Sequence, residues 1–199
     1  MTTAIIDTST ANIASVRYAL ERLDSPYILA RTPDEAGVCD RLILPGVGAA
    51  GPAMARLELT GWAKALREEA RPLLGVCLGM QLLFDHSEES DRDLLGLIPG
   101  RIEKLDPGED GPWPHMGWNT LTDFAEDEVL LDGIAERDRV YFVHGFYAPV
   151  GEHAVAQTRY GPAITAIARK GRVAGCQFHP ERSADVGARI LKNFLEAAA

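Results

Sequence analysis

Short apolar runs alternate with helical patterns in the first half of the chain. Runs at residues 3–7, 27–30 and 41–44 have the length and aliphatic content of buried strands. Between the first two runs, apolar residues recur at spacings of three and four, which predicts a helix with one apolar face. Those residues are Ile13, Val16, Leu20 and Leu23.

A further helix and strand are predicted between residues 60 and 77. Thr60 is the candidate N-cap of this helix, which runs through Leu66 and Ala70, and Pro72 marks its end. An apolar run from residue 73 is predicted as the next strand, followed by helix. Strands that alternate with helices in this way indicate βαβ units, and therefore a mostly parallel sheet covered on both faces.

Past residue 84 the pattern changes, and from residue 139 onward closely spaced β-type runs predict antiparallel strands added to the parallel core. These runs cover residues 140–143, 154–158, 163–168 and 173–178. A final helix is predicted after Ser183, its candidate cap, with one apolar side. That side carries Gly187, Ile190, Leu191, Phe194 and Leu195. We find no internal repeat or linker, and predict a single domain over residues 1–199.

Composition and charge narrow the function class. The 199 residues are 46% hydrophobic and 25% charged, as in ordinary globular proteins. A net charge of −9 argues against a nucleic-acid binder and against binding to an anionic membrane. The N-terminus lacks the basic and apolar regions of a signal peptide, and no apolar run approaches the ~20 residues that span a bilayer. Three separated cysteines make neither a disulfide framework nor a zinc pattern, so we expect a cytoplasmic protein without a metal.

Cys77 lies where the apolar run meets the predicted helix, with Gly75 and Gly79 two positions away on either side. This is the thiol form of a nucleophile elbow, a tight turn in which a side chain at either glycine would crowd the backbone. The free N–H groups and dipole of the helix start would favour a thiolate. A buried free cysteine in an apolar core is the other interpretation.

A nucleophilic cysteine needs a base and a group that orients the base. His179 and Glu181 are candidates, because side chains two residues apart on extended backbone point to the same side. The carboxylate would then fix the tautomer of the imidazole and stabilise the imidazolium. A surface histidine beside an unrelated acid is the alternative.

Acyl transfer also requires an oxyanion hole, usually made of backbone N–H groups. The N–H of Leu78, directly after the cysteine, is one candidate. Val47, in the Pro-Gly-Val-Gly segment 45–48, is the other, because strand ends of a parallel sheet converge on one edge. The same segment can also be an ordinary turn.

Other reactive side chains carry weaker signals. Cys176 lies in an apolar run, which predicts a buried thiol, and Cys39 precedes a predicted strand and has no basic neighbour in sequence. His86 and His153 lie in polar stretches and are expected at the surface. The acidic residues 88–93 are predicted to form a solvated loop.

Two motifs together, residues 75–81 (GVCLGMQ) and 177–181 (QFHPE), resemble the triad-type (class I) glutamine amidotransferases. The resemblance implies a flavodoxin-like α/β fold and glutamine hydrolysis without a cofactor. It assigns Cys77 as the nucleophile that attacks the glutamine amide, His179 as the proton relay and Glu181 as its orienter.

Three further segments, residues 44–48, 114–119 and 141–144, narrow the resemblance to the stand-alone glutaminase subunit of the family's histidine-biosynthesis member. It extends from about residue 5 to residue 195. It implies a (β/α)₈ cyclase partner that receives the ammonia.

The resemblance also implies binding residues. For glutamine these are Gly48, Gln81 and the backbone of Gly145 and Phe146. For the partner interface they are Asn12, Trp118, Tyr141 and Arg182.

The chain departs from the family pattern at three places. Gly145-Phe146 stands where Ser-Tyr is usual, and Arg182 stands where lysine is usual; arginine presents a planar fork rather than a point charge. Residues 8–12 read TSTAN instead of Tyr-Gly-x-Gly-Asn. Two alternatives remain: a glutaminase that serves an anthranilate-type or vitamin B6-type synthase, and an inactive regulatory subunit. The segment 115–119 argues against the first, and an intact Cys77, His179 and Glu181 against the second.

Overall fold

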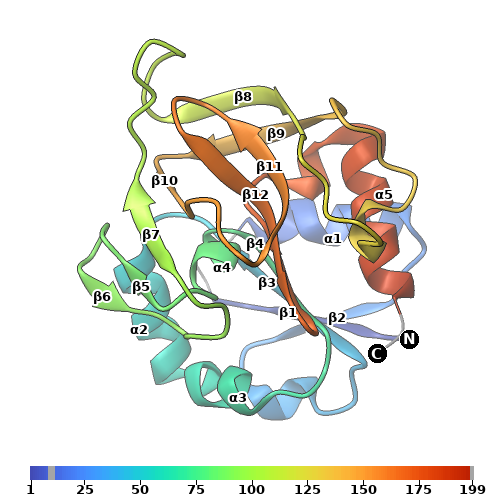
Figure 1. Ribbon diagram of the computed structural model, residues 1–199. Coiled ribbons are helices and arrows are strands. Elements are labelled where there is room, and N and C mark those ends of the chain that lie inside the picture. Colours follow the sequence, from blue (N-terminus) through green and yellow to red (C-terminus); the bar gives the residue numbers. More distant parts are fainter. Residues whose placement is uncertain (9–11, 198–199) are drawn as a thin grey trace.

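The computed structural model of the chain describes residues 1–8 and 12–197, and a seven-stranded sheet runs through this part (Figure 1). The strands of this sheet are β1 (Thr3–Ile6), β2 (Tyr27–Ala30), β3 (Arg41–Gly46), β4 (Leu73–Cys77), β11 (Ala154–Arg159), β12 (Ala163–Lys170) and β13 (Val173–Cys176). Their order is β11-β12-β13-β4-β3-β1-β2. The five strands from β2 to β13 pair in parallel, and β12 and β11 add antiparallel. The predicted α/β fold is confirmed.

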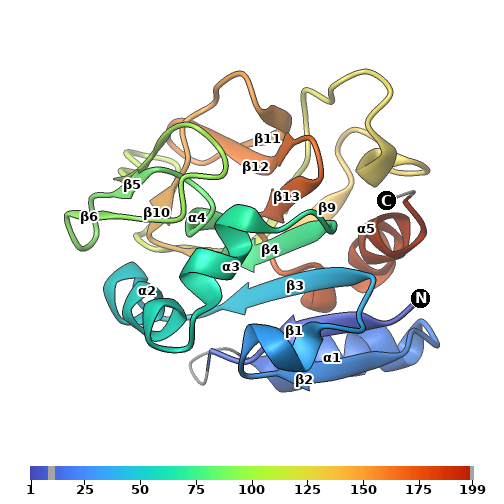
Figure 2. The ribbon, with the colours of Figure 1, turned by 90° about the horizontal axis from the view of Figure 1, so that it is seen from below.

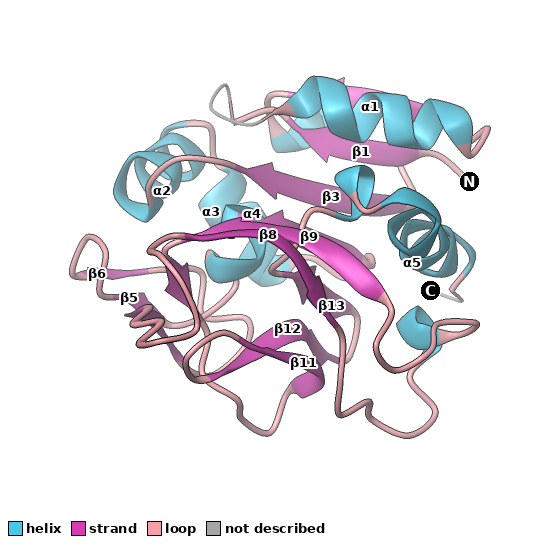
Figure 3. Ribbon diagram, turned by 90° about the horizontal axis from the view of Figure 1, so that it is seen from above, coloured by secondary structure: helices cyan, strands magenta, loops and turns pink. Residues whose placement is uncertain are grey.

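Helices cover both faces of this sheet, as parallel strands require for their crossover connections (Figures 2 and 3). The helices are α1 (Ile13–Arg22), α2 (Ala50–Leu59), α3 (Trp62–Glu68), α4 (Leu78–Gln81) and α5 (Ala184–Glu196). Alternate strand residues serve opposite faces. Ile43 and Leu74 pack in the cluster with α1 and α5, whereas Leu42, Leu44 and Leu73 pack in the cluster with α2, α3 and α4.

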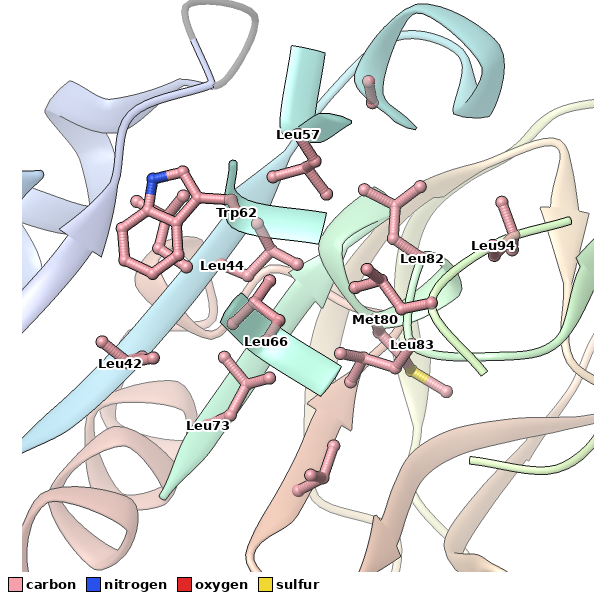
Figure 4. Close-up of a cluster of buried hydrophobic side chains, with 14 of the residues drawn as sticks. Leu42, Leu44, Leu57, Trp62, Leu66, Leu73, Met80, Leu82, Leu83 and Leu94 are labelled. Atoms are coloured by element: carbon pink, nitrogen blue, oxygen red, sulfur yellow. The ribbon is translucent and has the colours of Figure 1, made fainter. Parts of the chain in front are cut away.

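The second of these clusters fixes the strand ends near Cys77 (Figure 4). Trp62 and Leu66 of α3 lie over Leu44 of β3, and all three are essentially inaccessible to solvent. Met80 of α4 and Leu82 continue the cluster beyond the turn. Removing one such side chain typically costs about 2–5 kcal/mol of stability. The cluster therefore packs the turn after β4 against the sheet.

Two smaller sheets and three 3-10 turns complete the described part of the chain. One sheet has the order β10-β7-β5-β6, and the other pairs β8 with β9. Their bounds are β5 (His86–Ser87), β6 (Arg92–Asp93), β7 (Arg101–Lys104), β8 (His115–Thr120), β9 (Arg139–His144) and β10 (Phe146–Tyr147). The turns are η1 (Pro33–Ala36), η2 (Val129–Leu131) and η3 (Pro180–Arg182). No helix among the described residues has the length and apolarity to cross a membrane.

The region around Thr60 differs from the prediction. Thr60 is the C-cap of α2, a helix that the sequence pattern did not predict, and its hydroxyl donates back to the Arg56 carbonyl at 2.9 Å. The N-cap of α3 is instead Gly61, at φ 81°. The small residues and Pro52 of α2 hid its periodicity, although proline is tolerated in a first helical turn.

Two element ends also differ from the prediction. The strand predicted over residues 173–178 ends at Cys176, and the helix after Cys77 ends at Gln81. Ser183 stands at the N-cap of α5, as predicted, but its side chain makes no capping hydrogen bond. The Ser183 hydroxyl is instead engaged with the backbone of His179 and Tyr141.

Candidate active site

Cys77 ends β4 in a strained backbone conformation. Its φ is 54° and its ψ is −112°, a region that non-glycine residues rarely adopt and that often marks functional turns. The flanking glycines make the turn possible: a Cβ at Gly75 would lie 2.6 Å from the Gly79 oxygen, and one at Gly79 would overlap the Leu44 oxygen. Because α4 has only one turn, it offers free N–H groups at its start rather than a long helix dipole.

His179 and Glu181 are in direct contact. His179 Nδ1 lies 2.8 Å from Glu181 Oε1, and both side chains are buried. The contact does not arise on extended backbone as expected. His179 is extended, but η3 begins after it and turns Glu181 back toward the imidazole. Ser183 holds this turn, because its hydroxyl donates to the His179 carbonyl at 2.7 Å and accepts from the Tyr141 N–H at 2.9 Å.

The surroundings of His179 favour its charged form. Burial opposes the imidazolium, but hydrogen bonds to Cys77 and Glu181 outweigh that cost and raise the pKa of His179 to about 10. The Cys77 thiol also lies 3.6 Å from the Val143 carbonyl oxygen, which can accept from it. With its pKa raised to about 10, His179 holds a proton on its imidazole at neutral pH.

The sulfur faces a cavity of about 170 Å³. That volume is below the ~300–1,000 Å³ of pockets for drug-sized ligands and suits a small metabolite. The cavity collects eight residues singled out from the sequence: Val47, Gly48, Cys77, Leu78, Gln81, Gly145, Phe146 and His179. A larger cavity of about 280 Å³ between β7 and β12 contains none of them.

The side chain of Gln81 is fixed by two acceptors. Its Nε2 donates to the Phe146 carbonyl at 2.7 Å and to Gln177 Oε1 at 3.0 Å. A carbonyl only accepts, so this pairing orients the Gln81 amide without ambiguity. Both amide hydrogens are engaged, and the carbonyl oxygen of Gln81 is the part left for a ligand.

Glu89 was not identified from the sequence, where residues 88–93 were predicted to be a solvated loop. Residues 88–91 form a mostly exposed turn, and Arg92–Asp93 form β6. Glu89 lines the cavity, and its Oε2 accepts from the Ala50 N–H, at the start of α2, at 2.6 Å. Arg92 of β6 pairs with Glu58 of α2 at 2.6 Å. Glu89 reaches the cavity through contacts with α2. Because the periodicity did not predict α2, the local sequence did not identify Glu89 as a cavity residue.

Two buried histidines also escaped the sequence interpretation. His144 lines the cavity and its Nδ1 lies 2.9 Å from the Phe146 oxygen. Behind it, His115 is sandwiched between the rings of Phe142 and Tyr160, at centroid distances of 4.8 and 4.1 Å. Burial lowers the pKa of His115 to about 4 and, with the nearby His115, that of His144 to about 3. Both rings are therefore neutral at pH 7.

Three of the four residues expected at a partner interface lie together on β8, β9 and η3. Trp118, 45% exposed, packs edge-on against Tyr141 with ring centroids 6.0 Å apart. The guanidinium of Arg182 lies 5.9 Å from the centre of the same tyrosine ring. Asn12 is exposed immediately before α1. The neighbouring departure at residues 9–11 falls outside the described residues.

Comparisons with known proteins agree with these observations. The family model "Glutamine amidotransferase class-I" matches residues 4–198. The imidazole glycerol phosphate synthase subunit HisH of Xanthomonas campestris pv. campestris (strain 8004) is 51% identical over 193 residues, covering 97% of this chain and 96% of that protein. The subunit HisH of Xanthomonas axonopodis pv. citri (strain 306) is 53% identical over 195 residues, with the same coverage.

The fold is shared more widely. A crystal structure described as a glutamine amidotransferase has a TM-score of 0.75 at 20% identity, covering 98% of this chain and 97% of that one. This chain belongs to the class-I glutamine amidotransferases and, within them, to the family of HisH subunits of imidazole glycerol phosphate synthase.

Proposed function

We propose that the chain hydrolyses glutamine to glutamate and ammonia, and that it does so as the glutaminase subunit of imidazole glycerol phosphate synthase in histidine biosynthesis. The observation that carries this proposal is the His179–Glu181 contact of 2.8 Å beside Cys77, at a cavity of small-metabolite size. The identity of 51% to a HisH subunit over nearly the whole length supports the same conclusion.

The reaction follows from where the proton is held. The Cys77 sulfur attacks the side-chain amide carbon of glutamine, forming a C–S bond, and the proton on His179 passes to the departing nitrogen as the C–N bond breaks. Ammonia leaves a glutamyl thioester. His179 then takes a proton from water, whose oxygen attacks the thioester and releases glutamate and the sulfur. Glu181 holds Nδ1 and stabilises each imidazolium.

Two backbone N–H groups serve the oxyanion in this proposal. The N–H of Leu78 follows the nucleophile in the elbow, and the N–H of Val47 comes from the end of the neighbouring β3. Both residues line the cavity with Cys77. Removing one donor of this kind typically costs about 10²–10³ in kcat.

Substrate binding is assigned to the remaining cavity residues. The Gln81 carbonyl oxygen and Gly48 contact glutamine, and the backbone of Gly145 and Phe146 binds its α-groups. Glu89 adds a carboxylate at the same cavity, which complements the α-ammonium group. No cofactor is needed, because the triad alone supplies nucleophile, acid and base.

The ammonia passes to a (β/α)₈ cyclase subunit in this proposal. Asn12, Trp118, Tyr141 and Arg182 contact that subunit, and exposed apolar Met116 extends the same face at 63% exposure. We propose that the chain works as one domain in the cytoplasm, where its cysteines stay reduced. All three are free thiols in the described part of the chain.

A glutamine-like electrophile tests the proposal directly. In the complex with the cyclase, the label should alkylate Cys77 and spare Cys39 and Cys176, which serve as internal controls. Both control thiols are buried, and burial raises the pKa of each. Peptide mass spectrometry locates the adduct. A chain that never loses its Cys77 thiol, with or without partner and ligand, would not be a glutaminase.

A further inference from the structure

The indole of Trp113 occupies the space beside Gly145 at the cavity wall. A Cβ built on Gly145 would lie 2.5 Å from one carbon of that indole and 2.9 Å from another. The φ of Gly145 is not positive, so its backbone does not require glycine. The indole of Trp113 therefore fits in this place because residue 145 has no side chain.

Hydrogen bonds tie the same two residues together. Trp113 Nε1 donates to the Gly145 carbonyl at 3.0 Å, and the Leu105 N–H donates to that oxygen at 3.0 Å as well. Lys104 reinforces the position of the indole, because its Nζ lies 5.7 Å from the ring centre. The Gly145 peptide is thus held from the loop before β8 and from the end of β7.

The residues on either side of Gly145 are held independently. His144 Nδ1 and Gln81 Nε2 both donate to the Phe146 carbonyl, at 2.9 and 2.7 Å. The Gly145 carbonyl is held instead from outside the cavity, by the Trp113 indole and the Leu105 N–H. Half of its surface, 51%, remains exposed, so the ring is held by these contacts and not by burial in the core.

We propose that Trp113 is a positioning residue for glutamine: it aligns the Gly145 backbone that binds the α-groups of the substrate. This inference rests on the proposed glutaminase function. A free amino acid is recognised through its charged α-groups, and their hydrogen bonds depend on the orientation of the wall peptides. Loss of Trp113 should weaken glutamine binding and leave the Cys77–His179–Glu181 chemistry in place.

The test uses the chain in complex with its cyclase and measures glutamine hydrolysis. Trp113→Ala should raise KM for glutamine by roughly five- to tenfold, the scale of one lost hydrogen bond and its packing, with kcat changed less than twofold. Gly145→Ala should raise KM similarly, because the new methyl group displaces the indole. The double variant should be no worse than either single variant, since both act through one contact.

Controls separate this inference from general damage. Tyr18→Ala removes another exposed aromatic ring, 57% exposed on α1, and should leave KM unchanged. The indole N–H signal of Trp113 in an NMR spectrum, assigned from Trp113→Ala, should shift in Gly145→Ala and stay in place in the control.

Three outcomes would overturn the proposal. One is an unchanged KM in Trp113→Ala. Another is a double variant whose increase in KM equals the product of the increases in the two single variants. The third is a fall in kcat alone, which would place Trp113 in the chemistry. A wild-type complex without any glutaminase activity would instead overturn the proposed function itself.

Discussion

His115 Nδ1 lies 3.0 Å from His144 Nε2, and this contact is the middle link of an ordered hydrogen-bond chain. The Phe146 carbonyl can only accept, so the proton of neutral His144 is on Nδ1 and its Nε2 accepts from His115. Asn119 Nδ2 lies 3.3 Å from the remaining nitrogen of His115 and donates to it. The chain runs from Asn119 on β8 to the wall of the cavity.

This pair predicts a loss of stability in mild acid. The folded pKa values, about 4 and about 3, lie below the unfolded value of 6.5. The unfolded chain therefore binds more protons, and the free energy of unfolding falls as pH falls from 6.5 toward 4. In His115→Gln this slope should be shallower, measured by urea unfolding at several pH values. Identical slopes in both proteins would contradict the assignment.

His179 predicts the opposite dependence. Its folded pKa, about 10, lies above 6.5, so its contribution is complete below pH 6.5 and is lost as pH rises toward 10. Glu181→Gln keeps the shape but removes the charge that supports the imidazolium. We expect glutaminase kcat to fall at least ~10²-fold and the alkaline loss of stability to diminish. An unchanged kcat would exclude Glu181 as the orienting group.

Cys77→Ala should separate the two half-reactions. Without the sulfur, the complex should lose glutamine-dependent synthesis, because no thioester can form. Synthesis from added ammonium salts should remain, since the cyclase supplies that chemistry. Measuring both activities on the same preparation makes each the control of the other. Loss of both activities would contradict the proposal that this chain releases the ammonia and the cyclase carries out the synthesis.

The elbow glycines predict a stability effect of steric origin. Gly79→Ala places a methyl group against the Leu44 carbonyl oxygen and should destabilise the chain by about 3 kcal/mol or more. Gly151→Ala is the matched control, because a Cβ there meets nothing within 4 Å. Thermal unfolding should show a lower midpoint for the first variant only. Equal midpoints would mean that the sheet accommodates the methyl group.

We expect the isolated chain to hydrolyse glutamine slowly. Gly48 has φ 88°, a conformation that glycine adopts freely, so the neighbouring peptide that carries the proposed oxyanion donor can reorient. The cyclase and its ligand should raise the rate by stabilising the productive orientation. Steady-state glutaminase assays with and without the partner check this. Full turnover by the chain alone would refute it.

The sequence by itself determined the parallel strands, the elbow and the identity of the candidate triad. Apolar periodicity reports local burial, and the flanking glycines of Cys77 meet a steric demand set within a few residues. The sequence predicted the contact between His179 and Glu181, but it did not predict their backbone conformation. A 3-10 turn stands where an extended strand was expected.

Only the tertiary structure decided what surrounds that triad. Glu89 reaches the cavity by bonding to Ala50, 39 residues away, and His115 meets His144 across 29 residues. Trp113 lies beside Gly145 across 32 residues. Each of these contacts joins residues that lie far apart along the chain, so no local period reveals them. They depend on how the sheet, the β5–β6 hairpin and β8 pack against one another, which is decided only when the whole chain folds.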